Sequence, residues 1–220
     1  MFCSILSVIL HHNIIIMMLT GIKNIVFDLG GVLVDLDGKR CIDAFDAIGC
    51  HAISDYVRLH RTEDLFYDIE IGHTTTAEFC REVRSITHTS ATDTEIVGAW
   101  NALLTTIADE KKQRLLSLRR DYRVFLLSNT NDMHWRLCAD HLFNYGTWRA
   151  DDMFERIYLS YRLHLAKPDP AIFSHVLTDA GLQADETLFI DDNADNCRAA
   201  QSLGIHTLLQ SAANDWMQRL

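Results

Sequence analysis

An aspartate that directly follows a short apolar run is the first feature that could do chemistry. Residues Ile22 to Phe27 form a short, mostly apolar run with several β-branched side chains, and Asp28 comes next, followed after Leu29 by Gly30 and Gly31. Such a run predicts a buried strand, and the glycines after it would let a ligand approach the backbone closely. Asp28 is therefore a candidate nucleophile or metal ligand, although an aspartate that only caps a loop has the same local pattern.

A second apolar run leads to neutral hydrogen-bonding groups, and a proline-rich segment supplies a cation. Arg123 to Leu127 lead into Ser128 and Asn129, which offer a hydroxyl and an amide. Lys167 lies just before a predicted helix that Pro168 could start. Each of these residues could also be an ordinary turn residue or a solvated surface charge. The evidence for a functional site is that they occur together.

A third apolar run ends in paired carboxylates. Thr187 to Ile190 predict a buried strand, and Asp191 and Asp192 follow it. The pair could hold a cation, or it could cap the helix that follows.

Together these residues match what phosphoryl transfer requires. A phosphate dianion and an attacking carboxylate repel each other, so a hard cation bound through oxygen atoms must offset their charge. The acidic pair could hold Mg²⁺, and Lys167 would neutralise phosphate oxygens. Ser128 and Asn129 would donate hydrogen bonds to the same oxygens. Asp28 would form an aspartyl-phosphate, which divides hydrolysis into two easier displacements.

The intervening segments predict an α/β fold that brings these residues together. Ile172 to Ala180 carry one apolar stripe and are followed by Gly181, which is typical of a helix and its C-terminal stop. Ala194 to Leu203 have the same design and lead into a last predicted strand near Ile205 to Leu209. Alternating strands and helices predict a Rossmann-like, doubly wound parallel sheet. Ligands bind beyond the carboxyl ends of the strands in such sheets, which is where the polar residues lie.

One long segment interrupts this alternation. Residues 39–106 read as helical, with capping-box patterns at Thr75 to Glu78 and Thr92 to Glu95, and show no convincing buried strand. We therefore predict an inserted helical cap at 39–106 and a catalytic core formed by residues 20–38 and 107–220.

Residues 1–19 form an apolar N-terminal extension. Two histidines and an asparagine interrupt the run, and it lacks the basic flank and small-residue cleavage site of a secretory signal. Met17 and Met18 offer an alternative start just before the first predicted strand. We interpret the extension as an upstream start artefact or a poorly ordered segment, and a membrane anchor is the less favoured alternative.

Composition excludes some partners. The formal net charge of −10 leaves no basic field for a nucleic-acid backbone, so the expected partner is a small phosphorylated metabolite. The six cysteines show neither a CxxC pair nor zinc-ligand spacing, which favours free thiols and a cytoplasmic location.

Four segments resemble a known family. IVFDLGGVLVD, FLLSNTND, AKPDPAIF and FIDDNADN, in this order and spacing, are similar to the four motifs of haloacid dehalogenase (HAD) superfamily phosphatases. The resemblance covers Ile22 to about Leu209 and implies an inserted helical cap and a Mg²⁺ cofactor. It assigns Asp28 as the nucleophile, Ser128 as the second-motif residue, Lys167 as the third-motif lysine, Asp192 and the backbone carbonyl of Gly30 as further Mg²⁺ ligands, and Asp191 as a neighbouring assistant.

One position departs from the family pattern. Most phosphatases of the family carry a general acid and base two residues after the nucleophile, and here that residue is Gly30. Losing a general acid typically lowers the rate roughly 100-fold to 10,000-fold, and less when the leaving group is good. The D-L-G pattern most resembles the subgroup containing α-D-glucose-1-phosphate phosphatases, whose substrates have such a leaving group. Asp35 or Asp37 could instead supply the proton.

Two other functions remain open from the sequence. A metal-independent 2-haloacid dehalogenase would use the same aspartate and needs no acid at Gly30, but Asp191 and Asp192 would repel the carboxylate of its substrate. A phosphate-binding or partner-binding module that has lost turnover is the second alternative. Phosphorylation of Asp28 would distinguish an enzyme from this module.

Overall fold

The computed structural model describes residues 20–59, 65–212 and 215–220. The N-terminal extension, for which we expected a start artefact or a poorly ordered segment rather than a membrane anchor, lies outside the described residues. In the described part of the chain, no helix is both long and apolar enough to cross a membrane.

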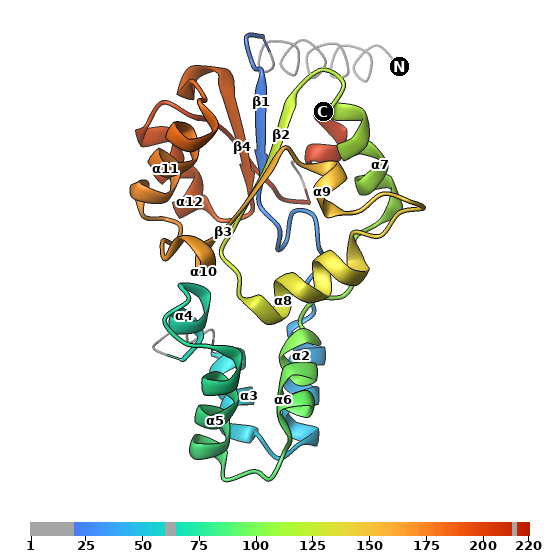
Figure 1. Ribbon diagram of the computed structural model, residues 1–220, viewed down its shortest axis with the longest axis vertical. Helices are drawn as coiled ribbons and strands as arrows, with labels where there is room; N and C mark the ends of the chain where they lie inside the picture. The colour runs from blue at the N-terminus through green and yellow to red at the C-terminus, as the bar shows by residue number, and fades with distance from the viewer. Residues whose placement is uncertain (1–19, 60–64, 213–214) are drawn as a thin grey trace, which may run out of the picture.

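The centre of the structure is a five-stranded sheet in the order β3-β2-β1-β4-β5 (Figure 1). All four neighbouring pairs run parallel. The strands are β1 (Asn24–Phe27), β2 (Arg123–Ser128), β3 (Arg156–Leu159), β4 (Thr187–Asp191) and β5 (His206–Leu209). The predicted α/β parallel sheet is confirmed, and the three apolar runs that end in polar residues form its three central strands.

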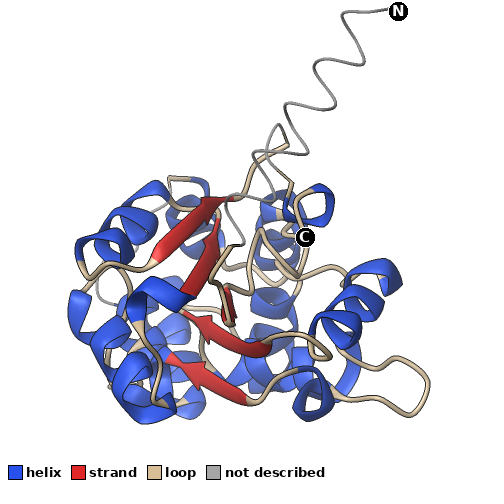
Figure 2. Cartoon of the chain, turned by 90° about the horizontal axis from the view of Figure 1, so that it is seen from above, coloured by secondary structure: helices blue, strands red, loops and turns tan. Residues whose placement is uncertain are grey.

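Helices cover both faces of this sheet, as Figure 2 shows from above. Side chains alternate along β1, so Ile25 and Phe27 pack into the hydrophobic cluster on one face while Val26 packs into the cluster on the other. On the first face lie α7 (Asp109–Leu118), α8 (Asp132–Leu137), the π-helical turn η1 (Cys138–Leu142), α9 (Ala150–Met153) and the C-terminal turn η3 (Trp216–Gln218). On the second lie α10 (Ser160–Leu163), α11 (Pro170–Ala180), the short turn η2 (Ala184–Glu186) and α12 (Ala194–Ser202).

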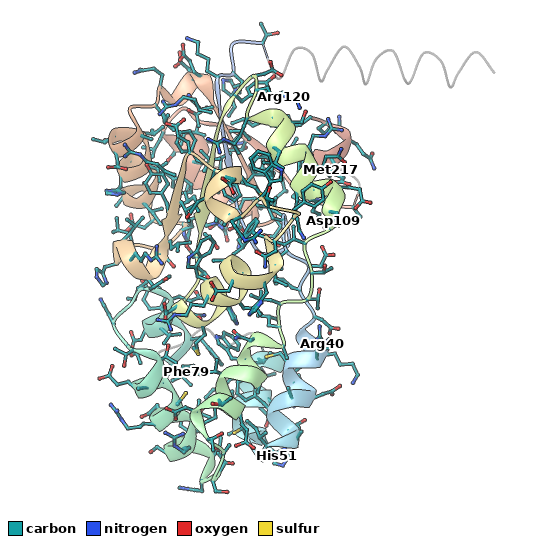
Figure 3. All side chains as sticks on the ribbon, turned by 45° about the vertical axis from the view of Figure 1, so that its right-hand side comes forward. Arg40, His51, Phe79, Asp109, Arg120 and Met217 are labelled. Atoms are coloured by element: carbon teal, nitrogen blue, oxygen red, sulfur yellow. The ribbon has the colours of Figure 1, made fainter. Side chains whose placement is uncertain are left out.

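A helical unit lies beyond the carboxyl ends of the strands, in the lower half of Figure 1. It comprises α2 (Gly38–Ala47), α3 (His51–Arg58), α4 (Leu65–Glu70), α5 (Thr76–Thr87) and α6 (Asp93–Asn101). Its helices bury a hydrophobic cluster of their own, which includes Phe45, Phe79 and Trp100. In Figure 3, Arg40, His51 and Phe79 lie on this unit, and Asp109, Arg120 and Met217 lie on the sheet and its helices.

Local signals explain where two of these helices begin. The predicted capping boxes are present: Thr75 accepts from the backbone N–H of Glu78 (3.3 Å), and Thr92 accepts from that of Glu95 (3.3 Å). Each glutamate in turn accepts from the backbone N–H of its threonine. These reciprocal bonds satisfy backbone donors that a helix start leaves unpaired.

Candidate active site

The centre of the site is a buried lysine between two buried carboxylates. Lys167 Nζ donates to Asp28 Oδ1 and to Asp191 Oδ2, each over 2.7 Å, and to the backbone carbonyl of Leu127 (3.2 Å). Asp28 follows β1, Asp191 ends β4, and Leu127 lies in β2, so three adjacent strands converge on one ammonium group. These strands are parallel, so their carboxyl ends meet at one edge of the sheet.

The start of α12 holds the Asp191 carboxylate in place. The backbone N–H of Asn193 donates to Asp191 Oδ1 (2.7 Å), and the amide of Asn196 donates to both carboxylate oxygens (3.1 Å each). With the bond from Lys167, both oxygens of Asp191 already accept two hydrogen bonds. The carboxylate is fully buried, and this set of donors compensates its charge.

Asp192 is the exposed member of the acidic group. One carboxylate oxygen from each of Asp28, Asp191 and Asp192 lies within 4.8 Å of the other two. The approach of Asp192 depends on Gly31, whose φ is +69°: a Cβ atom there would lie 2.1 Å from Asp192 Oδ2. Gly31 therefore leaves room for the Asp192 carboxylate beside the loop after β1.

This donor set fits a divalent cation. Mg²⁺ binds through oxygen atoms and usually uses one or two carboxylates, together with waters and phosphate oxygens. Asp28 and Asp192 have the required chemistry. The oxygens of Asp191 are already occupied by donors, so this residue is suited to hold its neighbours rather than to bind the ion directly.

Asn129 positions the backbone of Lys167. Its side-chain Nδ2 donates to the backbone carbonyl of Lys167 (2.8 Å), and its Oδ1 accepts from the backbone N–H of Lys167 (2.8 Å). Both polar groups of the amide are thus engaged. The amide therefore has a role that we did not expect, because it holds the loop that carries Lys167, and the predicted phosphate contact of Asn129 stays a prediction.

The segment after Lys167 also differs from the expectation. The next helix, α11, begins at Pro170 rather than at Pro168, and the side chain of Asp169 caps it by accepting from the backbone N–H of Ala171 (2.8 Å). Pro168 instead follows a cis peptide bond. The reason is that Asp169 is a better N-cap than Lys167, so the helix starts after the aspartate.

Ser128 and Gly30 lie in the same region without touching the ion pair. Ser128 ends β2 with a buried side chain, and its hydroxyl donates to the backbone carbonyl of Asn129 (3.3 Å). Gly30 is in the loop directly after Asp28, where a β-bridge joins it to Val34. The predicted phosphate contact of Ser128 and the predicted Mg²⁺ contact of the Gly30 carbonyl stay predictions.

Neither aspartate suggested as a substitute acid is free to serve the site. Asp35 is exposed and pairs with Lys111 (3.1 Å). Asp37 caps α2, where its Oδ1 accepts from the backbone N–H of Arg40 (3.0 Å). Both carboxylates are thus engaged in structural interactions.

Burial and the ion pairs act on the pKa values in opposite directions. The pKa of Asp28 is raised to about 7, chiefly because the carboxyl group is buried. The charge of Lys167 opposes this rise, and the charge of Asp191 adds to it. Burial lowers the pKa of Lys167, but the two carboxylates outweigh this effect and raise it above its ordinary value. Burial and the charge of Asp191 raise the pKa of Asp192. A cation would lower the pKa of Asp28 and Asp192, because it favours their charged forms.

Three further residues of the site were not predicted from the sequence. Asn196 lies within the segment FIDDNADN, five residues after Asp191, and its place in the first turn of the predicted helix was an available signal. Gly31 was noted only as one of two glycines that would let a ligand approach the backbone. Glu70 has no local signal at all, because α4 of the helical unit brings it to the site through tertiary packing.

The chain is similar to known proteins over most of its length. It is 33% identical over 201 residues to the D-ribitol-5-phosphate phosphatase of Bacteroides thetaiotaomicron, which covers 90% of this chain and 97% of that protein. A HAD family enzyme from the same organism, crystallised in complex with magnesium and inorganic phosphate, superimposes with a TM-score of 0.84 and 44% identity, covering 89% of this chain and 97% of that one. A HAD-like family hydrolase from Porphyromonas gingivalis gives a TM-score of 0.82 and 36% identity, with 90% and 95% coverage.

The family match spans strands β1 to β4, the helical unit and every residue of the site. The family model of the haloacid dehalogenase-like hydrolases matches residues 22–204. This range includes all four motif segments that carried the resemblance. The chain therefore belongs to the haloacid dehalogenase-like hydrolase family.

Proposed function

We propose that this protein is a Mg²⁺-dependent phosphatase that hydrolyses a small phosphorylated metabolite, with Asp28 as the nucleophile. The observation that carries the proposal is the buried ion pair of Lys167 with Asp28 and Asp191, beside the exposed carboxylate of Asp192. This arrangement supplies a nucleophile, a fixed cation and an acidic cation site within one crevice.

The residues have distinct tasks in this proposal. Asp28 attacks phosphorus and the bond to the leaving oxygen breaks, which gives an aspartyl-phosphate that water then hydrolyses. Lys167 offsets the charge of the phosphoryl oxygens, and the Ser128 hydroxyl donates to them. Mg²⁺, held by Asp28, Asp192 and the backbone carbonyl of Gly30, would supply the charge that lets two anions approach.

The substrate class we propose is sugar or polyol phosphates. The relative from Bacteroides thetaiotaomicron named as a D-ribitol-5-phosphate phosphatase supports this class. The D-L-G first motif keeps sugar 1-phosphates as a narrower candidate. We also propose that residues 39–106 act as a cap that covers the crevice and contacts the substrate, because this helical unit lies beyond the carboxyl ends of the strands.

Two observations bear on location and partners. The five cysteines in the described part of the chain are free, which supports our proposal that the enzyme works in the reducing cytoplasm. The net charge of −10 supports a small substrate over nucleic acid.

The acidic group argues against the two alternatives. Asp191 and Asp192, the two carboxylates beside the nucleophile, would repel the carboxylate of a haloacid, so a dehalogenase is less consistent with the site. A module that only binds phosphate would not need a nucleophile poised against a lysine.

Phosphate release tests the proposal. Purified protein would be given ribitol 5-phosphate, glucose 1-phosphate and glucose 6-phosphate with and without Mg²⁺, and Asp28→Asn would be compared with Asp35→Asn, a control aspartate paired with Lys111. We expect Mg²⁺-dependent release that Asp28→Asn abolishes and Asp35→Asn preserves. No release from any ester, or release that survives Asp28→Asn, would contradict the proposal.

A further inference from the structure

The site lacks a proton donor for the leaving oxygen among the residues considered so far. Gly30 occupies the position where the resemblance led us to look for one, and Asp35 and Asp37 serve other interactions. When a polyol phosphate is hydrolysed, the polyol leaves as an alkoxide, which is a poor leaving group without a proton. The helical unit provides a carboxylate that could supply it, namely Glu70.

Glu70 is tied to the second strand of the site through one buried serine. Glu70 is the last residue of α4, and its backbone carbonyl accepts from Ser160 Oγ (2.5 Å). Ser160 is fully buried, and its hydroxyl oxygen accepts from the backbone N–H of Thr130 (2.9 Å). Thr130 lies two residues after Ser128, so two hydrogen bonds through Ser160 join the backbone of Glu70 to the loop that follows β2.

The residues after Glu70 pack against the same part of the core, next to α10. The carbonyl of Ile71 accepts from His164 Nδ1 (2.8 Å). A Cβ atom on Gly72, whose φ is +72°, would lie 2.1 Å from the carbonyl oxygen of Tyr161, so only glycine permits this approach. Figure 1 shows α4 directly beside α10, at the carboxyl end of the sheet. The Glu70 segment is therefore docked on the core at several points.

The Glu70 carboxylate is within electrostatic reach of the reacting groups. Its pKa is raised from the ordinary 4.5 to about 7, chiefly because the carboxyl group is buried. The charge of Lys167 opposes this rise, and the charge of Asp28 adds to it. Glu70 is also at the C-terminal end of α4, where the helix dipole disfavours a negative charge. These influences favour a carboxyl group that can hold and release a proton near neutral pH.

We propose that Glu70 is the acid and base of this phosphatase, supplied by the helical unit in place of a residue at position 30. In the first step the protonated Glu70 gives its proton to the leaving oxygen as Asp28 displaces it, which releases the alcohol and leaves the Glu70 carboxylate. In the second step this carboxylate takes a proton from the water that attacks the aspartyl-phosphate. Phosphate leaves, and both Asp28 and Glu70 return to their starting forms.

This assignment rests on the proposed function and is tested by the dependence on the leaving group. Wild type and Glu70→Gln would be compared on ribitol 5-phosphate, whose alkoxide needs a proton, and on p-nitrophenyl phosphate, whose phenolate does not. We expect kcat/KM of Glu70→Gln to fall roughly 100-fold to 10,000-fold for the alkyl ester and less than about 10-fold for the aryl ester. With the aryl ester the variant should also release a burst of nitrophenolate, because hydrolysis of the aspartyl-phosphate lacks its base.

Controls separate this role from a structural one. Asp68→Asn changes a half-exposed carboxylate on the same helix and should leave both esters unaffected, and Glu70→Asp should recover part of the lost rate on the alkyl ester. Equal losses on both esters, no loss on either, or a rise in KM alone for the alkyl ester would overturn the assignment while leaving the proposed function intact. Absence of Mg²⁺-dependent release by wild type from both esters would instead refute the proposed function, and the assignment with it.

Discussion

Gly31→Ala should separate Asp192 from the other acidic residues without altering any polar group. The new Cβ would lie 2.1 Å from Asp192 Oδ2, whereas ordinary close contacts begin at 3.0 to 3.4 Å, so the carboxylate must move by about 1 Å. Misplacement of a reacting group by about 1 Å can lower the rate about 100-fold. The positive φ of +69° adds roughly 1–2 kcal/mol of backbone strain for alanine.

Gly146→Ala is the matched control, because it carries the strain without the clash. Gly146 has a φ of +56°, and no heavy atom lies within 4 Å of the position that a Cβ atom would take there. Urea denaturation should therefore show a loss of about 1–2 kcal/mol in both variants. A Mg²⁺ titration followed by phosphate release should show weakened affinity and about 100-fold lower kcat/KM in Gly31→Ala alone. Equal Mg²⁺ affinity in the two variants would refute the role of Gly31.

Three further predictions concern the groups around the site. Lys167→Met should destabilise the metal-free protein by about 3–5 kcal/mol at pH 8 in urea denaturation, because Asp28 and Asp191 lose their buried counter-ion. Added Mg²⁺ should restore part of this loss, and an unchanged urea midpoint would contradict the role of the ion pair. Asn196→Ala should cost about 1–3 kcal/mol in the same assay, because it removes two hydrogen bonds to a buried carboxylate, and a cost near zero would contradict that role. Burial lowers the pKa of His134 from 6.5 to about 4, so up to about 3 kcal/mol of the free energy of unfolding is present above pH 6.5 and is lost as the pH falls towards 4. His134→Gln should flatten this part of the profile of stability against pH, and parallel profiles for the variant and wild type would contradict it.

The central strands and the polar residues at their ends could be predicted because their signals are local. β1, β2 and β4 are short apolar runs that end abruptly in polar residues, and parallel pairing then brings those ends together. The capping boxes of α5 and α6 are equally local, since a threonine and a glutamate three residues apart suffice to define them.

The edge strand β3 could not be predicted in the same way. Arg156–Leu159 begins with an exposed arginine and has only two buried residues, so it lacks the apolar run that marked the central strands. It forms because β2 offers it an unpaired edge. Pairing with a partner distant in sequence leaves no local signal.

The functions of individual polar side chains also depend on tertiary contacts. The bonds of the Asn129 amide to the backbone of Lys167 were not expected, because Lys167 is distant in sequence. Glu70 reaches the site only because α4 docks on Ser160. The type of residue at the crevice was thus predictable, whereas the partner of each side chain required the structure.

Capture of the phosphorylated enzyme tests the central claim most directly. Wild type would be mixed with a phosphate monoester and Mg²⁺, quenched with acid during turnover, and digested for mass spectrometry alongside Asp28→Asn. We predict that the peptide containing residue 28 gains the mass of one phosphoryl group at Asp28 in wild type and that the variant peptide gains none. Continued phosphate release by wild type without any phosphorylated Asp28, under quench conditions that preserve acyl phosphates, would contradict the account.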